Sequence, residues 1–196
     1  PDPALGEFDD RFLPMGGASQ HRHAEASGFG HAQGGQGLAQ DVGLQLVPAL
    51  GLGAAADYLI SRDVVIVVAA GNSNSTSASY LGTRGDCLDV AATDKNGNGA
   101  SFTNYGSWVD VAAPGVEILS TYRNPDDTDP TAHYIALLDG TSMSAPHVVG
   151  IVALLESCNP ALTAADKFNL VVGNTTPYSD SRDLGSGIAN AYLALQ

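Results

Sequence analysis

The segment LLDGTSMSAPHVVGIVALLE, residues 137–156, decides how the rest of the sequence is interpreted. The letters DGTS have turn composition and the following residues are apolar on every side, so we predict a buried helix that begins near Ser142 and carries Pro146 in its first turn. A helix N-terminus has N–H groups without helical partners and a dipole that favours negative charge. A hydroxyl there is typical of a plain helix cap, and it also suits an oxyanion that forms beside it.

The sequence upstream predicts the elements that would pack against this helix. GAAADYLISRD (53–63) has a helical pattern, and VVIVVAA (64–70) is an apolar run of strand length, typical of a parallel strand covered on both faces. CLDVAATD (87–94) and WVDVAAPG (108–115) predict further short strands that end in turn residues. Strands that alternate with helices indicate an α/β fold.

Two of these segments resemble the subtilisin-like serine proteases, the subtilases of peptidase family S8. GTSMSAPHVVG (140–150) is similar almost residue for residue to the family's nucleophile motif, and VVAAGN (67–72) is similar to its strand that ends in Ala-Ala-Gly-Asn. The segments 93–115, 118–121 and 185–195 match the family in the same order. The resemblance covers about residues 53–196 and implies a three-layer α/β fold with a mainly parallel sheet.

The resemblance also implies roles for individual residues. Ser142 would be the nucleophile, and its own N–H and the side-chain amide of Asn72 would bind the oxyanion of the tetrahedral intermediate. One wall of the pocket for the side chain before the scissile bond would be formed by Ala69, Ala70 and Gly71, and Thr141 completes the expected substrate-binding set.

The catalytic histidine and aspartate of the family have no counterpart in the sequence. Both should precede Asn72, yet GHAQGGQG around His31 lacks the family pattern and lies only 41 residues before it. FDDRF lacks the family's aspartate turn, so neither Asp9 nor Asp10 is assigned. Residues 1–50 also contain no Ile, Thr, Tyr, Asn or Lys. We therefore expect the N-terminal part of the fold to be missing or degenerate, with residues 1–52 an atypical segment without family match and 53–196 the C-terminal part of the catalytic domain.

The other histidines do not replace the missing base. His147 follows Ser142 by five residues, which places it about 140° around the helix, so we predict a packing role. His133 is predicted at the surface. The HRH letters at 21–23 together with His31 lack the cysteines or spaced carboxylates of a metal site.

Composition limits the partners. A net charge of −13 disfavours binding along a nucleic acid, and no apolar run approaches the ~20 residues of a membrane span. Cys87 and Cys158 can pair or stay free. The resemblance implies polypeptide substrates, a secreted enzyme and a monomer when complete; it allows for calcium, for which the sequence identifies no site.

Three function classes come into question for a serine in this setting. An α/β-hydrolase is excluded because residue 144 is not Gly and no histidine follows His147. A non-catalytic subtilase-like module without the His/Asp relay remains an alternative. The prediction is a serine endopeptidase that acts through an acyl-enzyme on Ser142, present as an incomplete catalytic domain that is inactive as this chain alone.

Overall fold

A five-stranded sheet organises the part of the chain that the computed structural model describes, residues 51–122, 128 and 134–196. The strand order is β1-β2-β3-β7-β6, with neighbours parallel from β1 to β7 and β6 antiparallel to β7. The strands are β1 (Val67–Ala69), β2 (Leu88–Thr93), β3 (Val111–Pro114), β6 (Thr175–Thr176) and β7 (Ile188–Ala189). The predicted α/β fold with a mainly parallel sheet is thus confirmed.

Both faces of the central strands are covered. Successive side chains of a strand point to opposite faces, and in β2 the side chains of Leu88 and Val90 join the cluster formed with α2 and α3, while Ala91 joins a second cluster. That second cluster contains Leu184 and is packed against Trp108, so loops cover the face of the sheet away from α2. Burial on both faces explains the continuous apolar runs in the sequence.

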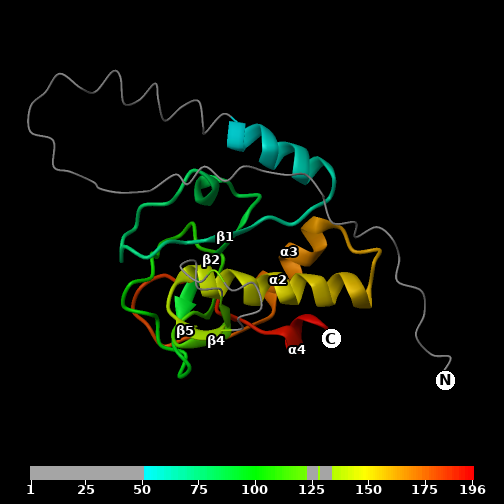
Figure 1. The fold of residues 1–196 in the computed structure, drawn as a ribbon. Helices are drawn as coiled ribbons and strands as arrows, with labels where there is room; N and C mark the ends of the chain where they lie inside the picture. The colour runs from blue at the N-terminus through cyan, green and yellow to red at the C-terminus, as the bar shows by residue number, and fades with distance from the viewer. Residues whose placement is uncertain (1–50, 123–127, 129–133) are drawn as a thin grey trace, which may run out of the picture. The chain divides into compact units, whose positions relative to one another are not determined.

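Helices cover the first face. Helix α2 (Thr141–Cys158) packs against β1, β2 and β3, and α3 (Ala164–Gly173) and α4 (Ala191–Ala194) pack against α2 (Figure 1). Residues 51–61 are also helical, and η1 (Leu81–Thr83) is a short 3-10 helix. Helix α3 begins with a capping box, in which Thr163 and Asp166 each accept a hydrogen bond from the other's backbone N–H.

Helix α2 differs from the prediction in two respects. Its buried face carries Val148, Ile151 and Leu155, but Val149 and Leu154 on the other face are 50% and 48% exposed, because no described residue covers them. The helix also begins at Thr141, which places Pro146 in the second turn rather than the first. Pro146 has no N–H to donate to the carbonyl oxygen of residue 142.

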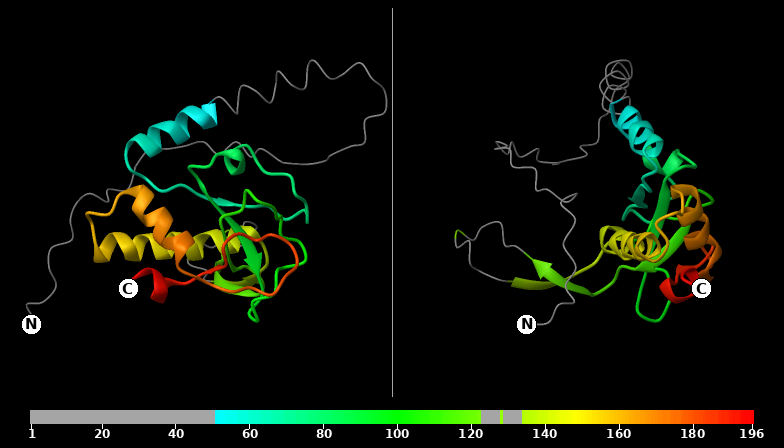
Figure 2. Two further views of the ribbon diagram at one scale, coloured as in Figure 1. Left: turned by 180° about the vertical axis from the view of Figure 1, so that it is seen from behind. Right: turned by 90° about the vertical axis from the view of Figure 1, so that its right-hand side faces the viewer.

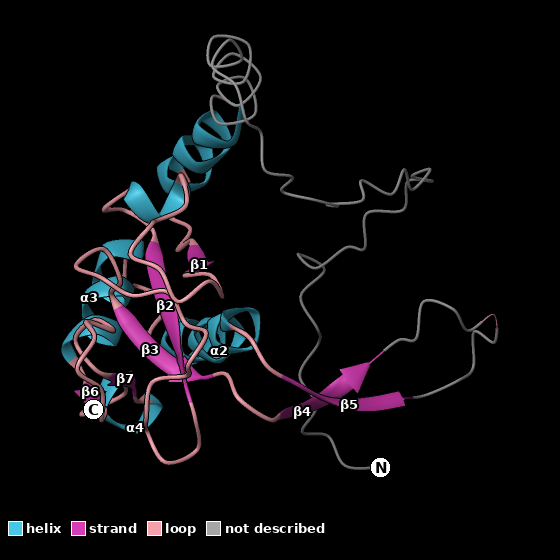
Figure 3. Cartoon of the chain, turned by 90° about the vertical axis from the view of Figure 1, so that its left-hand side faces the viewer, coloured by secondary structure: helices cyan, strands magenta, loops and turns pink. Residues whose placement is uncertain are grey.

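A second, antiparallel sheet projects from the body of the fold. Strands β4 (Ile118–Tyr122) and β5 (Tyr134–Leu138) pair over their whole length (Figures 2 and 3). Apolar side chains on this hairpin are exposed, among them Leu119 at 61% and Ile135 at 72%. Such a surface favours association with other apolar surfaces.

One carboxyl group is buried without a partner. Asp89 in β2 is 1% exposed, and neither of its carboxylate oxygens has a hydrogen-bond partner among the described residues. Its backbone N–H donates to the carboxylate of Asp110 at 2.7 Å. Burial, and secondarily the charge of Asp110, raises the pKa of Asp89 to about 7. Burial likewise raises the pKa of Asp110.

Candidate active site

The hydroxyl of Ser142 lies at the exposed N-terminal end of α2. The chain enters this helix through Gly140, whose φ of +151° is a conformation that residues with a side chain rarely adopt. A Cβ at Gly140 would also lie 3.3 Å from Nδ2 of Asn72. Glycine at position 140 therefore allows the helix to start directly beside Asn72.

The first N–H groups of α2 have separate partners. The N–H of Thr141 donates to Oδ1 of Asn72 at 2.9 Å, and that of Met143 donates to the carbonyl oxygen of Gly140 at 2.9 Å. Within the described ranges, no partner is found for the N–H or the hydroxyl of Ser142. This N–H is therefore free to donate to a ligand at the positive end of the helix dipole.

Asn72 follows β1, and its amide has a defined orientation. Oδ1 accepts hydrogen bonds from both the N–H and the hydroxyl of Thr141, each at 2.9 Å. Because Oδ1 takes both donors, the NH₂ group must face the other way, and it has no partner among residues 51–122, 128 and 134–196. The side chain is exposed. Two unpaired donors thus lie close to one point, since a Cβ on Gly140 would be 3.3 Å from Nδ2 of Asn72 and 3.7 Å from the backbone nitrogen of Ser142.

Thr141 itself joins β1 to α2. It is buried, and its hydroxyl accepts a hydrogen bond from the N–H of Gly71 at 3.0 Å while donating to Asn72. The end of the strand and the start of the helix are therefore tied together by one side chain.

The three residues expected to form a pocket wall are not equivalent. Ala70 is 3% exposed and its methyl group belongs to a core cluster, so only its backbone can face a ligand. Ala69 and Gly71 are half-buried, and Gly71 has a φ of +106°. Of the three positions, these two are therefore the accessible ones, although neither lines the cavity beside Ser142.

A cavity of about 320 Å³ opens beside Ser142. Its lining comes from the start of α2 and from one strand of the projecting hairpin: Ile118, Leu119, Ser120, Ser142, Met143, Pro146 and His147. Sequence reasoning did not assign the β4 residues to the site. Their signal is weak, because ILST (118–121) is identified only as a segment that matches the family, not as a strand next to Ser142.

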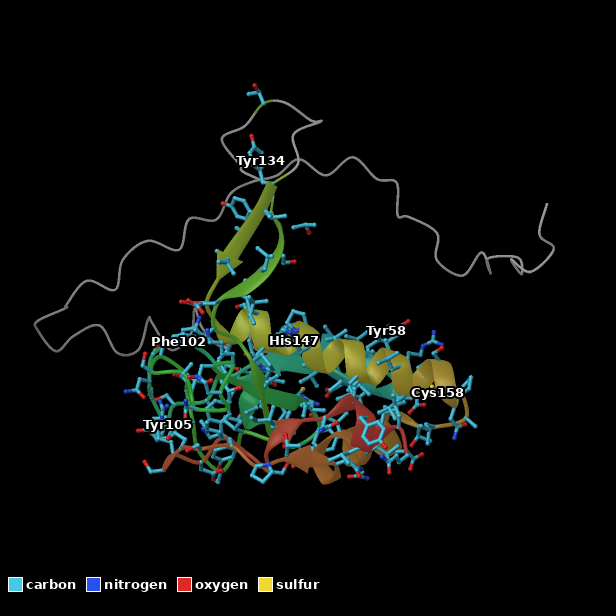
Figure 4. The ribbon with its side chains drawn as sticks, turned by 90° about the horizontal axis from the view of Figure 1, so that it is seen from below. Tyr58, Phe102, Tyr105, Tyr134, His147 and Cys158 are labelled. Carbon is cyan, nitrogen blue, oxygen red and sulfur yellow. The ribbon has the colours of Figure 1, made fainter. Side chains whose placement is uncertain are left out.

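His147 is exposed, so the predicted packing role is wrong for the described part of the chain. Its Nδ1 lies 2.8 Å from the carbonyl oxygen of Met143, and no contact joins its ring to the hydroxyl of Ser142. Figure 4 shows it on α2 near the base of the hairpin, whose far end carries Tyr134. The Nδ1–H donates to that carbonyl in the neutral ring, which leaves Nε2 as the acceptor.

Several residues that the sequence analysis considered lie outside the described residues. The structure does not describe Asp9, Asp10, His31, His133 or the histidines at 21 and 23.

In the described ranges, no group of three or more His, Cys, Asp or Glu side chains is arranged to hold a metal ion. Both cysteines are free, Cys87 buried and Cys158 exposed. No helix among the described residues is long and apolar enough to cross a membrane.

The sequence of this chain matches a known protein family. The model of the subtilase family matches residues 28–189. The chain belongs to the subtilase family. The matched range begins within the segment 1–52 that sequence analysis set apart, in a stretch that the structure describes only from residue 51.

Several subtilases are similar over most of this chain. Subtilisin BL from Lederbergia lenta is 39% identical over 147 residues, which are 75% of this chain and 52% of that protein. Thermitase from Thermoactinomyces vulgaris is 40% identical over 148 residues, 74% of this chain and 49% of its own length. An extracellular protease from Xanthomonas campestris pv. campestris is 39% identical over 140 residues, 69% of this chain and 24% of that protein.

Solved structures show the same relationship. A protease from Pseudoalteromonas arctica superposes with a TM-score of 0.65 and 34% identity, over 69% of this chain and 43% of its own. The prenylagaramide maturation protease PagA, at a TM-score of 0.64 and 24% identity, shares the fold. This subtilase chain spans about half the length, or less, of the curated relatives it matches.

Proposed function

We propose that this chain supplies the nucleophile and the oxyanion-binding groups of a subtilase serine endopeptidase. The observation that carries the proposal is the pair of unpaired donors, the N–H of Ser142 and the NH₂ of Asn72, beside an exposed serine hydroxyl. Family membership supports serine protease activity in general. Polypeptides would be the substrates, and Ala69 and Gly71 would contact the side chain before the scissile bond.

The reaction would run through an acyl-enzyme. A base takes the proton of the Ser142 hydroxyl while Oγ bonds to the carbonyl carbon of the peptide, and the negative charge that forms on the carbonyl oxygen is stabilised by the N–H of Ser142 and the amide of Asn72. The protonated base then gives its proton to the leaving amine as the C–N bond breaks. Water, activated by the same base, hydrolyses the ester and restores the hydroxyl.

The base is not among the described side chains. His147 is the one histidine in the ranges 51–122, 128 and 134–196, and its ring is bonded to the helix backbone rather than to Ser142. This observation favours the alternative, a non-catalytic subtilase-like module. It also leads us to propose that the 196-residue chain alone is inactive, as a C-terminal part (residues 53–196) of a catalytic domain.

Labelling with a fluorophosphonate probe, which needs an activated serine, tests these proposals. We expect label at Ser142 in an enzyme that contains this segment together with its family's histidine, and little label on this chain. Loss of the base costs ~10⁶ in kcat in subtilisins, leaving ~10³–10⁴ over water. Ser142→Ala is the control that removes the acceptor hydroxyl.

Three outcomes separate the alternatives. Absence of label in both proteins supports the non-catalytic module. Labelling of this chain that is abolished by both Ser142→Ala and His31→Ala shows that the N-terminal segment supplies the base, which contradicts the sequence analysis. Label in the longer enzyme alone supports the proposed function and the inactivity of this chain.

We propose secretion because one of the relatives is named an extracellular protease. A monomeric complete enzyme stays a prediction, as does calcium binding, which subtilases show in general. The described residues that we assign to the site include no metal ligand set.

A further inference from the structure

Asn104 makes four hydrogen bonds to the backbone of residues 70–75, the segment that carries Asn72. It is 7% exposed, in the loop between β2 and β3. Its Nδ2 donates to the carbonyl oxygen of Ala70 at 2.9 Å, and its backbone N–H donates to the carbonyl oxygen of Gly71 at 2.8 Å. Its Oδ1 accepts from the N–H of residues 73 and 75, at 2.9 and 3.2 Å.

We infer that Asn104 is a positioning residue for the oxyanion-binding amide, acting through the backbone of residues 70–75. Asn72 lies in the middle of the four contacts and makes none of them itself, so its backbone is held on both sides while its NH₂ group stays free to bind a ligand. The inference rests on the proposed function of Asn72.

The physical need for such a residue follows from where β1 ends. Ala70 still donates to β2, to the carbonyl oxygen of Val90 at 3.0 Å, but residues 71–75 belong to no strand. Their inward backbone groups need partners, because buried backbone N–H and C=O groups are almost always paired. One asparagine amide, with a donor and an acceptor, supplies the partners that a neighbouring strand would otherwise provide.

Gly71 and Asn104 are matched in shape. A Cβ at Gly71 would lie 2.5 Å from Nδ2 of Asn104, and the φ of +106° already disfavours any side chain there. The absence of a side chain at residue 71 thus creates the space that the Asn104 amide fills. Asn72 is held from two directions, since Thr141 fixes its amide group and Asn104 fixes its backbone.

A double-mutant cycle tests whether Asn104 acts through Asn72. In an enzyme that contains this segment and cleaves peptides, we expect Asn104→Ala to lower kcat by ~10–10²-fold, less than the ~10²–10³-fold of removing an oxyanion donor itself. In the Asn72→Leu background the same change should lower kcat by less than ~3-fold, because the amide it positions is gone. A merely structural role predicts the same fold-loss in both backgrounds.

Two further variants keep the test decisive. Asn104→Asp retains the acceptor for the N–H groups of residues 73 and 75 but places an oxygen against the carbonyl oxygen of Ala70, so it should also lower kcat in the Asn72 background only, and it serves if the alanine variant fails to fold. The matched control is Asn174→Ala, which removes a donor to the carbonyl oxygen of Leu170 at 2.8 Å and should leave kcat unchanged.

Hydrogen exchange on the 196-residue chain gives a readout without activity. Asn104→Ala should accelerate exchange of the amides at residues 73 and 75 relative to those of β2. Unchanged protection of these two amides, or an equal kcat loss in both backgrounds, overturns the inference. If Asn72→Leu itself leaves kcat unchanged, the proposed function has failed, and this result is distinct from a failure of the role of Asn104.

Discussion

Replacing the buried Asp89 with asparagine should remove a large part of the pH dependence of stability. The carboxyl group is 1% exposed, its oxygens have no partner among the described residues, and Asp110 adds a second negative charge nearby. Asparagine has nearly the same shape and carries no charge at any pH. The variant therefore isolates the cost of ionising this one group inside the sheet.

The sign and size of the effect follow from the pKa. Burial raises the pKa of Asp89 in the folded protein to about 7, from 3.8 when it is unperturbed. Between these two pH values the native state holds a proton on Asp89 that the unfolded state has lost. The contribution of Asp89 to the free energy of unfolding is therefore fully present below pH 3.8 and falls as the pH rises to 7. Each pH unit is worth about 1.4 kcal/mol. From about pH 5 to pH 8 the native protein should lose about 2.7 kcal/mol that Asp89→Asn does not lose.

Urea unfolding of the full chain and of Asp89→Asn at about pH 5, 6, 7 and 8 measures this difference. Any cost of burying the unpaired amide, ~1–3 kcal/mol, is the same at every pH and cancels in the comparison. The difference in unfolding free energy between variant and wild type should thus grow with pH up to about 7 and then level off. Parallel pH profiles for the two proteins would show that Asp89 is ionised throughout, and the reasoning from burial would be wrong.

Three further predictions concern the site and the hairpin. In an active enzyme with this segment, Asn72→Leu should lower kcat by ~10²–10³-fold, as known for subtilisins, with little change in KM; a loss confined to KM removes Asn72 from the mechanism. Thr141→Val removes the hydroxyl that donates to Oδ1 of Asn72 but keeps the N–H that does so, and kcat should therefore fall by only about 10-fold. An unchanged kcat would contradict the role of the Thr141 hydroxyl in orienting the Asn72 amide. Ile135→Lys, at a side chain 72% exposed, should reduce self-association in sedimentation velocity while Tm shifts by less than ~2 °C; unchanged association would exclude the hairpin as the contact surface.

The strands and helix α2 were predictable because their patterns are local. The run 64–70 predicted a strand, and β1 forms at its C-terminal end, where only Val67–Ala69 pair with β2. The segments 87–94 and 108–115 contain β2 and β3, and 53–63 overlaps the helix at 51–61. The sequence motifs alone predict that Ser142 and Asn72 lie close together. In the structure, Thr141, the neighbour of Ser142, makes two hydrogen bonds to Asn72.

Other features depend on contacts that no local pattern reveals. The two-residue strand β7 exists because Ile188 pairs with Ala112, far away in sequence. The hairpin had a usable signal, since ILSTY and YIALL are rich in strand-forming residues around a segment with two prolines, but nothing in it predicts a wall beside Ser142. The exposure of Val149 and Leu154 could not be foreseen either, because an apolar helix looks the same in sequence whether or not its second face is covered.

The hydrogen bonds of Thr141 to residues 71 and 72 join parts of the chain that are about seventy residues apart in sequence. Contacts between such distant segments form late, because the intervening chain must first be ordered at a cost in loop entropy. After dilution from urea, the helical far-ultraviolet signal should therefore return before Asn72 and Ser142 reach their native positions. If Ser142 and Asn72 act as we propose, activity would appear only at the final stage of folding, and partly folded molecules would carry the serine without being able to use it.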